Sequence, residues 1–258
     1  LDRIPCLHTV NYLSEAVRKA RSVKNLYNNK EPMEKANSLI KAVITGATGM
    51  VGDGVLMECL NHPNVTEVLV IGRKKCGRVH PKMKEIVHSD MFDISLIADQ
   101  LSGYNACFFC LGTTSVGKTE EEYNRITTIL AVDFAKVLLQ KNSAMTFCFV
   151  SGAGTDGTEK SKTMWARVKG KAENELMKLP FKKVFCFRPG FMDPSEGQNN
   201  VHSGYKYLGW IYPAARKIFP KYFSTMKEVA LAMIHSVLYG YEKQVLEVSD
   251  MVELAKRG

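Results

Sequence analysis

The chain has 258 residues, which is enough for one large α/β domain with a substantial core or for two small domains. Its hydrophobic content of 45% and its charged content of 24% are ordinary for a globular protein. The longest apolar runs contain only a few residues, so we expect no transmembrane segment.

The formal net charge of +9 has two interpretations. A nucleic-acid-binding protein is one of them, but the Lys and Arg residues are spread along the chain and accompany no recognised nucleic-acid motif. We therefore favour a solvated basic surface with a few cations for an anionic cofactor, and we expect no nucleic-acid partner.

Residues 1–32 differ in composition from the rest of the chain. Residues 14–27 are a basic, weakly amphipathic helix candidate, and residues 28–32 are a helix breaker. An arginine-rich leader with few acids can be a targeting peptide. We favour an upstream or non-native extension in front of a start at Met33.

The seven cysteines indicate a reducing compartment, because four of them lie inside apolar, strand-like runs and suit buried thiols. We accordingly expect a cytoplasmic protein. Cys107 and Cys110 have the spacing of a redox pair, but an offset of three along a strand points two side chains to opposite faces. We therefore expect neither a redox pair nor a metal site there.

Strand-like and helix-like segments alternate from residue 42 onward. The expected strands are 42–44, 65–71, 85–88, 106–111, 145–150, 183–187 and 245–248. The expected helices are one that begins near Val51, then 120–141, 164–179, 229–239 after a capping box of Thr225 and Glu228, and a last one from a cap at Ser249 to Lys256. This alternation predicts an α/β fold with a Rossmann-like, doubly wound parallel sheet.

The pattern changes after Gly190. Residues 193–204 are typical of a loop, and residues 205–223 mix aromatic with basic side chains. The second segment could bind a membrane surface or a partner. We favour packed aromatic residues in a small lobe that closes over the site. The expected domain is thus 33–258, a single Rossmann domain in which 191–258 contribute the substrate lobe.

Three glycines lie three residues apart where the first strand turns into the first helix. Gly46 permits the tight turn, Gly49 lets backbone N–H groups approach a pyrophosphate, and Gly52 lets the helix pack against the strand. The N-terminus of the helix favours the anion. The motif predicts a dinucleotide-binding site. The alternative is a glycine-rich turn that has only a structural role.

A basic run follows the second strand, 21 positions after Gly52, where an acid would bind the ribose 2′-hydroxyl of NAD. The chain has Arg73, Lys74 and Lys75 there and no Asp or Glu, so we favour NADP(H) over NAD(H). A solvated charge run is the alternative. Asp90, after the third strand, either accepts from the adenine amino group or forms a turn.

The ends of strands supply the remaining candidates, since ligands of open α/β sheets lie outside the carboxyl ends of the strands. The expected cofactor-binding residues are Gly46, Thr48, Gly49, Met50, Val51, Gly52, Arg73, Lys74, Asp90, Leu111, Gly112, Thr113, Thr114, Lys169, Pro189 and Gly190.

Five segments together resemble a known family: residues 45–52, 71–73, 110–114, 168–173 and 187–190. With them the chain resembles the atypical and extended short-chain dehydrogenase/reductases. The resemblance is strongest to the Tat-interacting oxidoreductase-like branch and to its bacterial relatives labelled NAD-dependent epimerases. It implies a Rossmann fold, NADP(H) binding and hydride chemistry on a carbonyl or alcohol.

The chain departs from this family at the catalytic pair. The family has a tyrosine four residues before a lysine, and the lysine lowers the pKa of the phenol that protonates the carbonyl. Trp165 precedes Lys169 here, and an indole N–H cannot act as a general acid. Lys169 is expected to bind the nicotinamide ribose, and Ser151 is the candidate for the family's catalytic serine.

The predicted cofactor site and the altered catalytic pair are compatible with three functions. The first is an NADP-dependent oxidoreductase of a small carbonyl or alcohol with an altered catalytic pair. The second is a non-catalytic protein that senses NADP(H), and the third and weaker one is a nucleotide-sugar-type epimerase or dehydratase. The substrate, the proton donor, and the existence of a protein partner or homodimer stay open.

Residues 1–32 are expected to be dispensable, because their composition differs and a breaker follows them. A chain that starts at Met33 should melt within a few degrees of the full chain and bind NADPH with the same affinity. Differential scanning calorimetry and titration with NADPH measure both. A large loss of melting temperature would show that these residues dock on the core.

Overall fold

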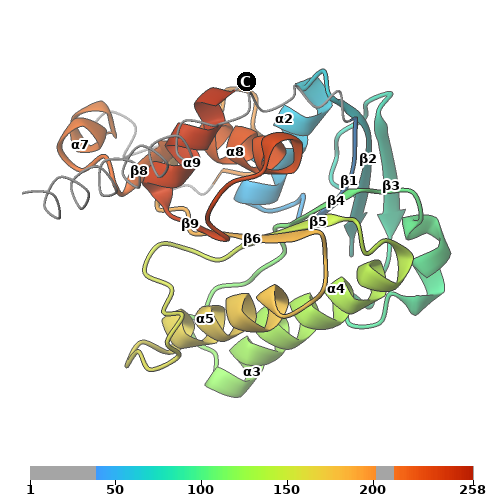
Figure 1. The fold of residues 1–258 in the computed structure, drawn as a ribbon, viewed down its shortest axis with the longest axis horizontal. Helices are drawn as coiled ribbons and strands as arrows, with labels where there is room; N and C mark the ends of the chain where they lie inside the picture. The colour runs from blue at the N-terminus through green and yellow to red at the C-terminus, as the bar shows by residue number, and fades with distance from the viewer. Residues whose placement is uncertain (1–38, 202–211, 258) are drawn as a thin grey trace, which may run out of the picture. The chain divides into compact units, whose positions relative to one another are not determined.

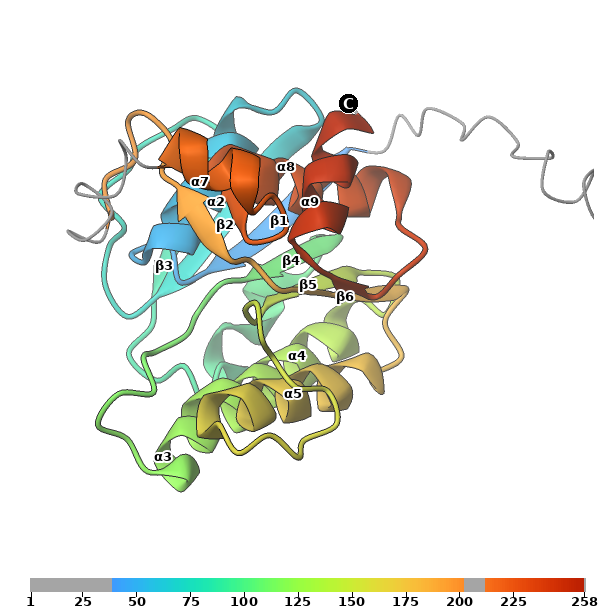
Figure 2. The same ribbon diagram turned by 90° about the vertical axis from the view of Figure 1, so that its left-hand side faces the viewer.

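A seven-stranded parallel sheet forms the centre of the computed structural model, which describes residues 39–201 and 212–257 (Figures 1 and 2). The strand order is β3-β2-β1-β4-β5-β6-β9. The strands are β1 (Ile40–Thr45), β2 (Val65–Gly72), β3 (Met83–Val87), β4 (Ala106–Phe109), β5 (Thr146–Val150), β6 (Lys183–Phe187) and β9 (Val245–Leu246). The chain order reverses between β1 and β4, which defines the switch point of a doubly wound fold. The predicted Rossmann-like fold is confirmed; the predictions for residues 1–32 lie outside the described residues.

Helices cover both faces of the sheet (Figure 1). One face carries α2 (Met50–Asn61), α8 (Met226–Tyr239), α9 (Val248–Leu254) and the short η3 (Ala255–Arg257). The other carries α3 (Glu120–Asn124), the π-helical turn η2 (Arg125–Ile129), α4 (Leu130–Lys141), α5 (Met164–Met177) and the 3-10 helix η1 (Ser95–Leu101). The predicted helix 120–141 is therefore present, and the π-helical turn interrupts its α-helical hydrogen bonding.

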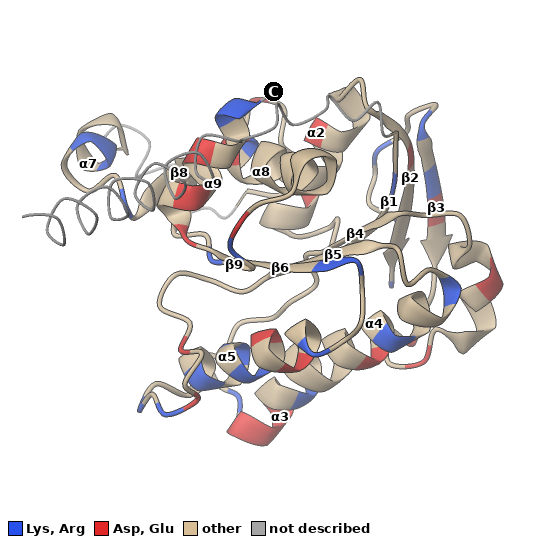
Figure 3. Cartoon of the chain, in the orientation of Figure 1, with Lys and Arg blue, Asp and Glu red and all other residues tan. Residues whose placement is uncertain are grey.

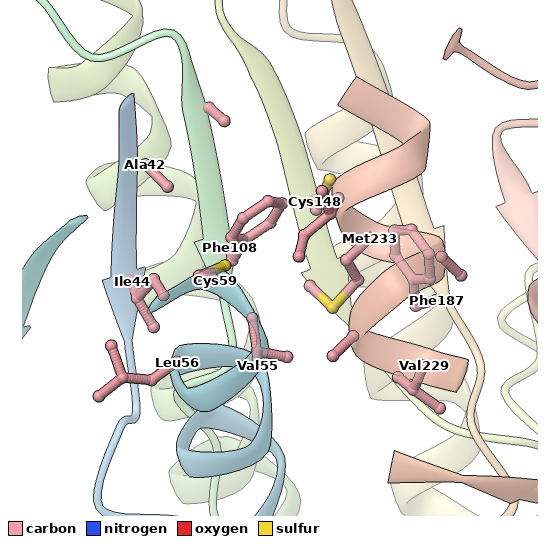
Figure 4. Packing of buried hydrophobic residues seen from close by; sticks show 14 of the residues in the cluster. Ala42, Ile44, Val55, Leu56, Cys59, Phe108, Cys148, Phe187, Val229 and Met233 are labelled. Carbon is pink, nitrogen blue, oxygen red and sulfur yellow. The ribbon is translucent and has the colours of Figure 1, made fainter. Parts of the chain in front are cut away.

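Each face of the sheet buries its own apolar cluster, because side chains alternate along a strand. Figure 4 shows the first cluster, in which Ile44 and Phe108 of the sheet meet α2 and α8. Cys107 belongs to the second cluster, whereas Cys110 packs against the first. The two thiols therefore lie on opposite faces, as predicted, and burial raises the pKa of both.

The glycine-rich turn brings three backbone segments into direct contact. Gly46 has a φ of +72°, and a Cβ added to it would lie 2.6 Å from the Cys110 carbonyl carbon. A Cβ added to Gly52 would lie 2.2 Å from the Gly46 carbonyl oxygen. The first turn of α2 thus packs directly on the end of β1, and no side chain fits at either position.

The C-terminal part contributes to the central sheet and to one of its helical layers, and the role of 191–258 as a substrate lobe stays a prediction. β9 extends the central sheet and α8 packs on α2, while β7 (Phe191–Asp193) and β8 (Phe223–Thr225) pair separately beside α7 (Tyr212–Ile218). The predicted capping box of α8 is present, since Glu228 N donates to Thr225 Oγ1 at 3.1 Å. The predicted cap at Ser249 is wrong. Glu247 is the N-cap of α9, because its backbone is extended and its N–H donates to Asp250 Oδ2 at 3.0 Å.

The aromatic segment is only partly packed. The rings of Phe191 and Phe223 stack at 5.4 Å between centroids, but Phe219 is 56% exposed and Tyr222 is 59% exposed. Residues 205–211 lie outside the described part. Lys and Arg residues occur on most of the elements (Figure 3), in line with the spread along the sequence. No helix among the described residues is long and apolar enough to cross a membrane.

Candidate cofactor site

A cavity of about 740 Å³ opens at the carboxyl ends of β1, β2 and β4, beside the switch point. Its walls come from the glycine turn, from the loops after β2, β3 and β4, and from η2 and the start of α4. Nine predicted cofactor-binding residues line it, namely Gly46, Thr48, Gly49, Arg73, Lys74, Asp90, Leu111, Gly112 and Thr113. The fold thus gathers residues that are up to 67 positions apart in the sequence.

The N-terminus of α2 adjoins this cavity, because its N-cap residue Gly49 is one of the lining residues. Gly49 is the N-cap, its backbone is extended, and no side chain caps the helix. The predicted residues Met50, Val51 and Gly52 form the first turn behind it. Thr45 Oγ1, fully buried, accepts from Leu111 N at 3.3 Å and holds the loop after β4 against the end of β1. The helix dipole and free N–H groups make this end suited to an anion.

Cations dominate the charged part of the wall. Arg73, Lys74 and Lys118 line the cavity, and none of the three forms a salt bridge with another described residue. Asp90 is the acid of the wall; its Oδ1 accepts from Phe92 N at 2.9 Å. The turn-forming interpretation of Asp90 is therefore observed directly. Its contact with an adenine stays a prediction.

An apolar wall was missed in the sequence. Phe92, Ile126 and Leu130 line the cavity, and the Arg125 guanidinium lies 4.9 Å from the centroid of the Phe92 ring. Ile126 belongs to the π-helical turn, a feature that is frequent at functional sites. Nothing in the local sequence marks this turn or the return of Lys118 to the cavity, because both depend on the packing of distant elements.

Lys169 and Trp165 lie on α5, next to the loop after β5. The Lys169 ammonium donates to the backbone carbonyl of Ser151. Burial lowers the pKa of Lys169 to about 8, against the opposing effect of the Glu173 carboxylate. A Cβ added to Gly154 would lie 3.3 Å from Cη2 of Trp165, so the indole edge lies against that loop. Neither Lys169 nor Trp165 lines the cavity described above.

Ser151 is held by a buried ionic network. Its hydroxyl donates to Glu173 Oε1 at 2.5 Å and also lies 3.0 Å from the Phe187 carbonyl oxygen. Arg188 binds both oxygens of Glu173, at 2.5 and 3.0 Å, and reaches Glu247 at 3.0 Å. The carboxylates raise the pKa of Arg188 further, the hydrogen bond to Glu173 contributing most. The Ser151 hydroxyl thus has a structural partner, and its catalytic role stays a prediction.

Three further predicted residues stand apart from the cavity. Thr114 Oγ1 accepts from Val116 N at 3.2 Å and shapes the loop after β4. The Pro189 carbonyl accepts from Ala153 N at 2.8 Å. Gly190 is in close contact with the residue that precedes β8, because an added Cβ would lie 2.3 Å from the Tyr222 carbonyl oxygen. Thr114, Pro189 and Gly190 therefore stay predictions as cofactor contacts.

Asp53 is another residue that the sequence did not single out. Its side chain is 1% exposed, and Oδ1 accepts from Arg78 Nε at 2.6 Å. Oδ2 accepts from the backbone N–H groups of Asn199 and Asn200 at 2.7 and 3.0 Å. Gln198 Nε2 adds a bond of 2.6 Å to the Met50 carbonyl. The loop after β7 is therefore anchored on the first turn of the cofactor-site helix.

Comparison with known proteins identifies relatives of this chain. No protein-family model matches it. Protein fmp52-1, mitochondrial, of Aspergillus terreus is 25% identical over 235 residues, which span 84% of this chain and 100% of that protein. Protein HTATIP2 of Rattus norvegicus is 26% identical over 171 residues, which span 64% of this chain and 69% of that protein. The predicted resemblance is confirmed.

Among solved structures, the Bordetella bronchiseptica enzyme WbmG in complex with NAD is similar, with a TM-score of 0.61 and 13% identity over 87% of this chain and 79% of that chain. Helicobacter pylori ADP-L-glycero-D-manno-heptose-6-epimerase gives a TM-score of 0.57 and 14% identity over 86% and 82% of the two chains. At these identities the likeness concerns the fold, and it agrees with the Rossmann-like sheet.

The same relatives correct the predicted location. The fmp52 proteins of several fungi, 25–27% identical to this chain, are named mitochondrial. The prediction of a cytoplasmic protein is therefore contradicted. Its premise was too weak, because thiols buried in an apolar core are shielded from oxidants and do not distinguish one reducing compartment from another.

The depressed pKa of Lys169 predicts a pH-dependent stability. The unfolded chain holds this proton up to a pKa near 10.5, whereas the folded chain releases it near 8. Between these values the unfolded state binds more protons, so the stability of the native chain should rise with pH relative to that of Lys169→Met. Thermal unfolding of both chains at pH 7 to 10 measures the difference, and a constant difference would contradict a buried, titrating ammonium.

Proposed function

We propose that this cavity binds the adenosine half of a nicotinamide dinucleotide, with the pyrophosphate at the N-terminus of α2. The observation that carries the proposal is the meeting, in one cavity, of an uncapped helix N-terminus, a turn in which Gly46 leaves no room for a side chain, and cations without an ion-pair partner among the described residues. The apolar wall with Phe92 and Ile126 suits an adenine ring. WbmG, which has a similar fold, was crystallised in complex with NAD.

The preferred cofactor in this proposal is NADP(H). Arg73 and Lys74 follow β2 directly, at the place where an acid would repel a 2′-phosphate. Both side chains line the cavity without an ion-pair partner among the described residues. Leaving two cations unpaired favours a ligand that brings its own negative charge, and a guanidinium can bind a phosphate through two hydrogen bonds.

The reaction class we propose is the reduction of a small carbonyl compound or the oxidation of the alcohol. Bound NADPH would supply the hydride in the reduction, and bound NADP⁺ would accept it in the oxidation. Lys169, held by the Ser151 carbonyl beside the glycine-containing loop 152–154, is the residue that would orient the nicotinamide ribose. Trp165 occupies the position of the phenol and cannot deliver a proton. We therefore infer an oxidoreductase whose proton transfer is impaired or rerouted.

Trp165 also supports a second candidate, a non-catalytic protein that binds NADP(H) and reports its redox state to a protein partner. The two candidates share the cofactor site and differ in turnover. In both, residues 33–258 act as one domain, with the segment from 191 onward adding the substrate or partner surface. The names of the fungal relatives favour a mitochondrial location for either.

Replacing Arg73 by Ala tests the cofactor preference. The variant should bind NADPH more weakly by about 1–3 kcal/mol, the contribution of a charged hydrogen bond, and should bind NADH nearly unchanged. Lys75→Ala is the matched control, because Lys75 belongs to the same basic run but does not line the cavity. Calorimetric titration gives both affinities, and equal losses for the two cofactors would refute the preference for NADP(H).

Turnover separates the two candidate functions. General acid catalysis is typically worth about 10²–10⁴ in rate, so the unmutated chain should oxidise NADPH slowly or undetectably with ordinary ketones and aldehydes. The loss of NADPH absorbance across a panel of carbonyl compounds measures this, with Lys169→Ala as the control. Rapid turnover that survives Trp165→Phe would show that another residue supplies the proton and that the site is not impaired.

A further inference from the structure

Lys118 lies in the loop between β4 and α3, and its position in that loop is fixed. Its N–H donates to the Ser115 carbonyl at 3.2 Å, and Gly117 before it has a φ of +75°. Thr119 after it is the N-cap of α3, in a capping box with Glu122. A lysine held between a turn and a helix cap presents its side chain to a defined region, here the cavity.

The acids that follow Lys118 in the sequence do not neutralise it. Glu120 binds Arg167 through both of its oxygens, at 2.8 and 2.5 Å. Glu122 Oε2 accepts from the Thr119 N–H at 2.9 Å. Glu121 is exposed and forms no salt bridge with a described residue. Three consecutive acids beside Lys118 thus leave it without an ion pair in the described part of the chain.

The cavity consequently has three cationic side chains, Arg73, Lys74 and Lys118, against the single carboxylate of Asp90 among its described lining residues. Arg73 and Lys74 come from the β2 side, and Lys118 comes from the β4 side, with the glycine turn of β1 between them. In the proposed site the backbone N–H groups at the start of α2 would bind the pyrophosphate, so the excess positive charge is available to a further anionic group.

We propose that Lys118 is a specificity-determining residue that contacts the 2′-phosphate of bound NADP(H) together with Arg73. Lys118 lines the same cavity as Phe92 and Ile126, the residues that would contact the adenine ring. The 2′-phosphate is attached to the ribose that carries this ring, so an unpaired cation of the same cavity can bind it. The inference rests on the proposed NADP(H) function. It adds a contact from the β4 side of the cavity to the contact that Arg73 would make from the β2 side.

Two small probes isolate the contact. Adenosine 2′,5′-bisphosphate carries the 2′-phosphate, and 5′-AMP lacks it, while both contain the adenine and the 5′-phosphate. Calorimetric titration of the full chain should show that Lys118→Ala weakens the bisphosphate about tenfold or more, the effect of a charge-assisted hydrogen bond, and changes 5′-AMP less than about twofold. Lys118→Arg should retain most of the affinity. Lys256→Ala, which removes an exposed lysine of η3 that does not line the cavity, should leave the affinity for both probes unchanged.

The outcomes are distinguishable. An equal loss for both probes would place Lys118 at the 5′-phosphate or the ring and overturn the inference, and so would an unchanged affinity for the bisphosphate. If the native chain binds NADPH and the Lys118→Ala variant binds both probes with the affinity of the native chain, the inference alone is wrong. If the native chain binds neither probe nor NADPH, the proposed function is wrong as well.

Discussion

The contact on which the structure depends is the close approach of three backbone segments at the switch point between β1 and β4. The glycine turn touches the chain at Cys110, and the first turn of α2 touches the Gly46 carbonyl, at distances that leave no room for a Cβ. This contact sets the position of the N-terminus of α2 relative to the ends of β1 and β4. The cavity lies where these ends meet, so a side chain at Gly46 or Gly52 would displace its walls.

Two buried carboxylates connect the rest of the chain to this centre. Asp53 joins the first turn of α2 to Arg78 and to the loop after β7, and Glu173 joins α5 to Ser151 and Arg188. Removing one partner of a buried pair typically costs about 3–5 kcal/mol, because the other charge is left uncompensated. Each carboxylate has its full set of partners within the fold. The cations that line the cavity, in contrast, have no ion-pair partner among the described residues.

The two halves of the site differ in whether their polar groups already have partners within the protein. In the half that would hold adenosine, unpaired cations, an apolar wall and free backbone N–H groups surround one cavity. In the half that would hold the reacting groups, polar side chains already have protein partners: Lys169 binds the Ser151 carbonyl, and the Ser151 hydroxyl binds Glu173. Trp165 adds bulk there without a titratable proton. The arrangement of these residues is therefore better suited to binding a cofactor than to transferring a proton.

The sequence by itself determined the sheet, the helices around it and nine residues of the cavity wall, because these depend on local patterns: apolar runs, glycine spacing and the residues that directly follow strands. It misplaced the cap of α9, since Ser249 is the residue type that favours an N-cap and only the backbone path puts Glu247 at that position. Tertiary structure alone decided the remainder. Lys118 and Phe92 reach the cavity because crossovers return their loops to one edge of the sheet. Ser151 turns to Glu173, 22 residues away, because α5 and β6 bring a carboxylate and Arg188 to it, and no local pattern encodes that meeting.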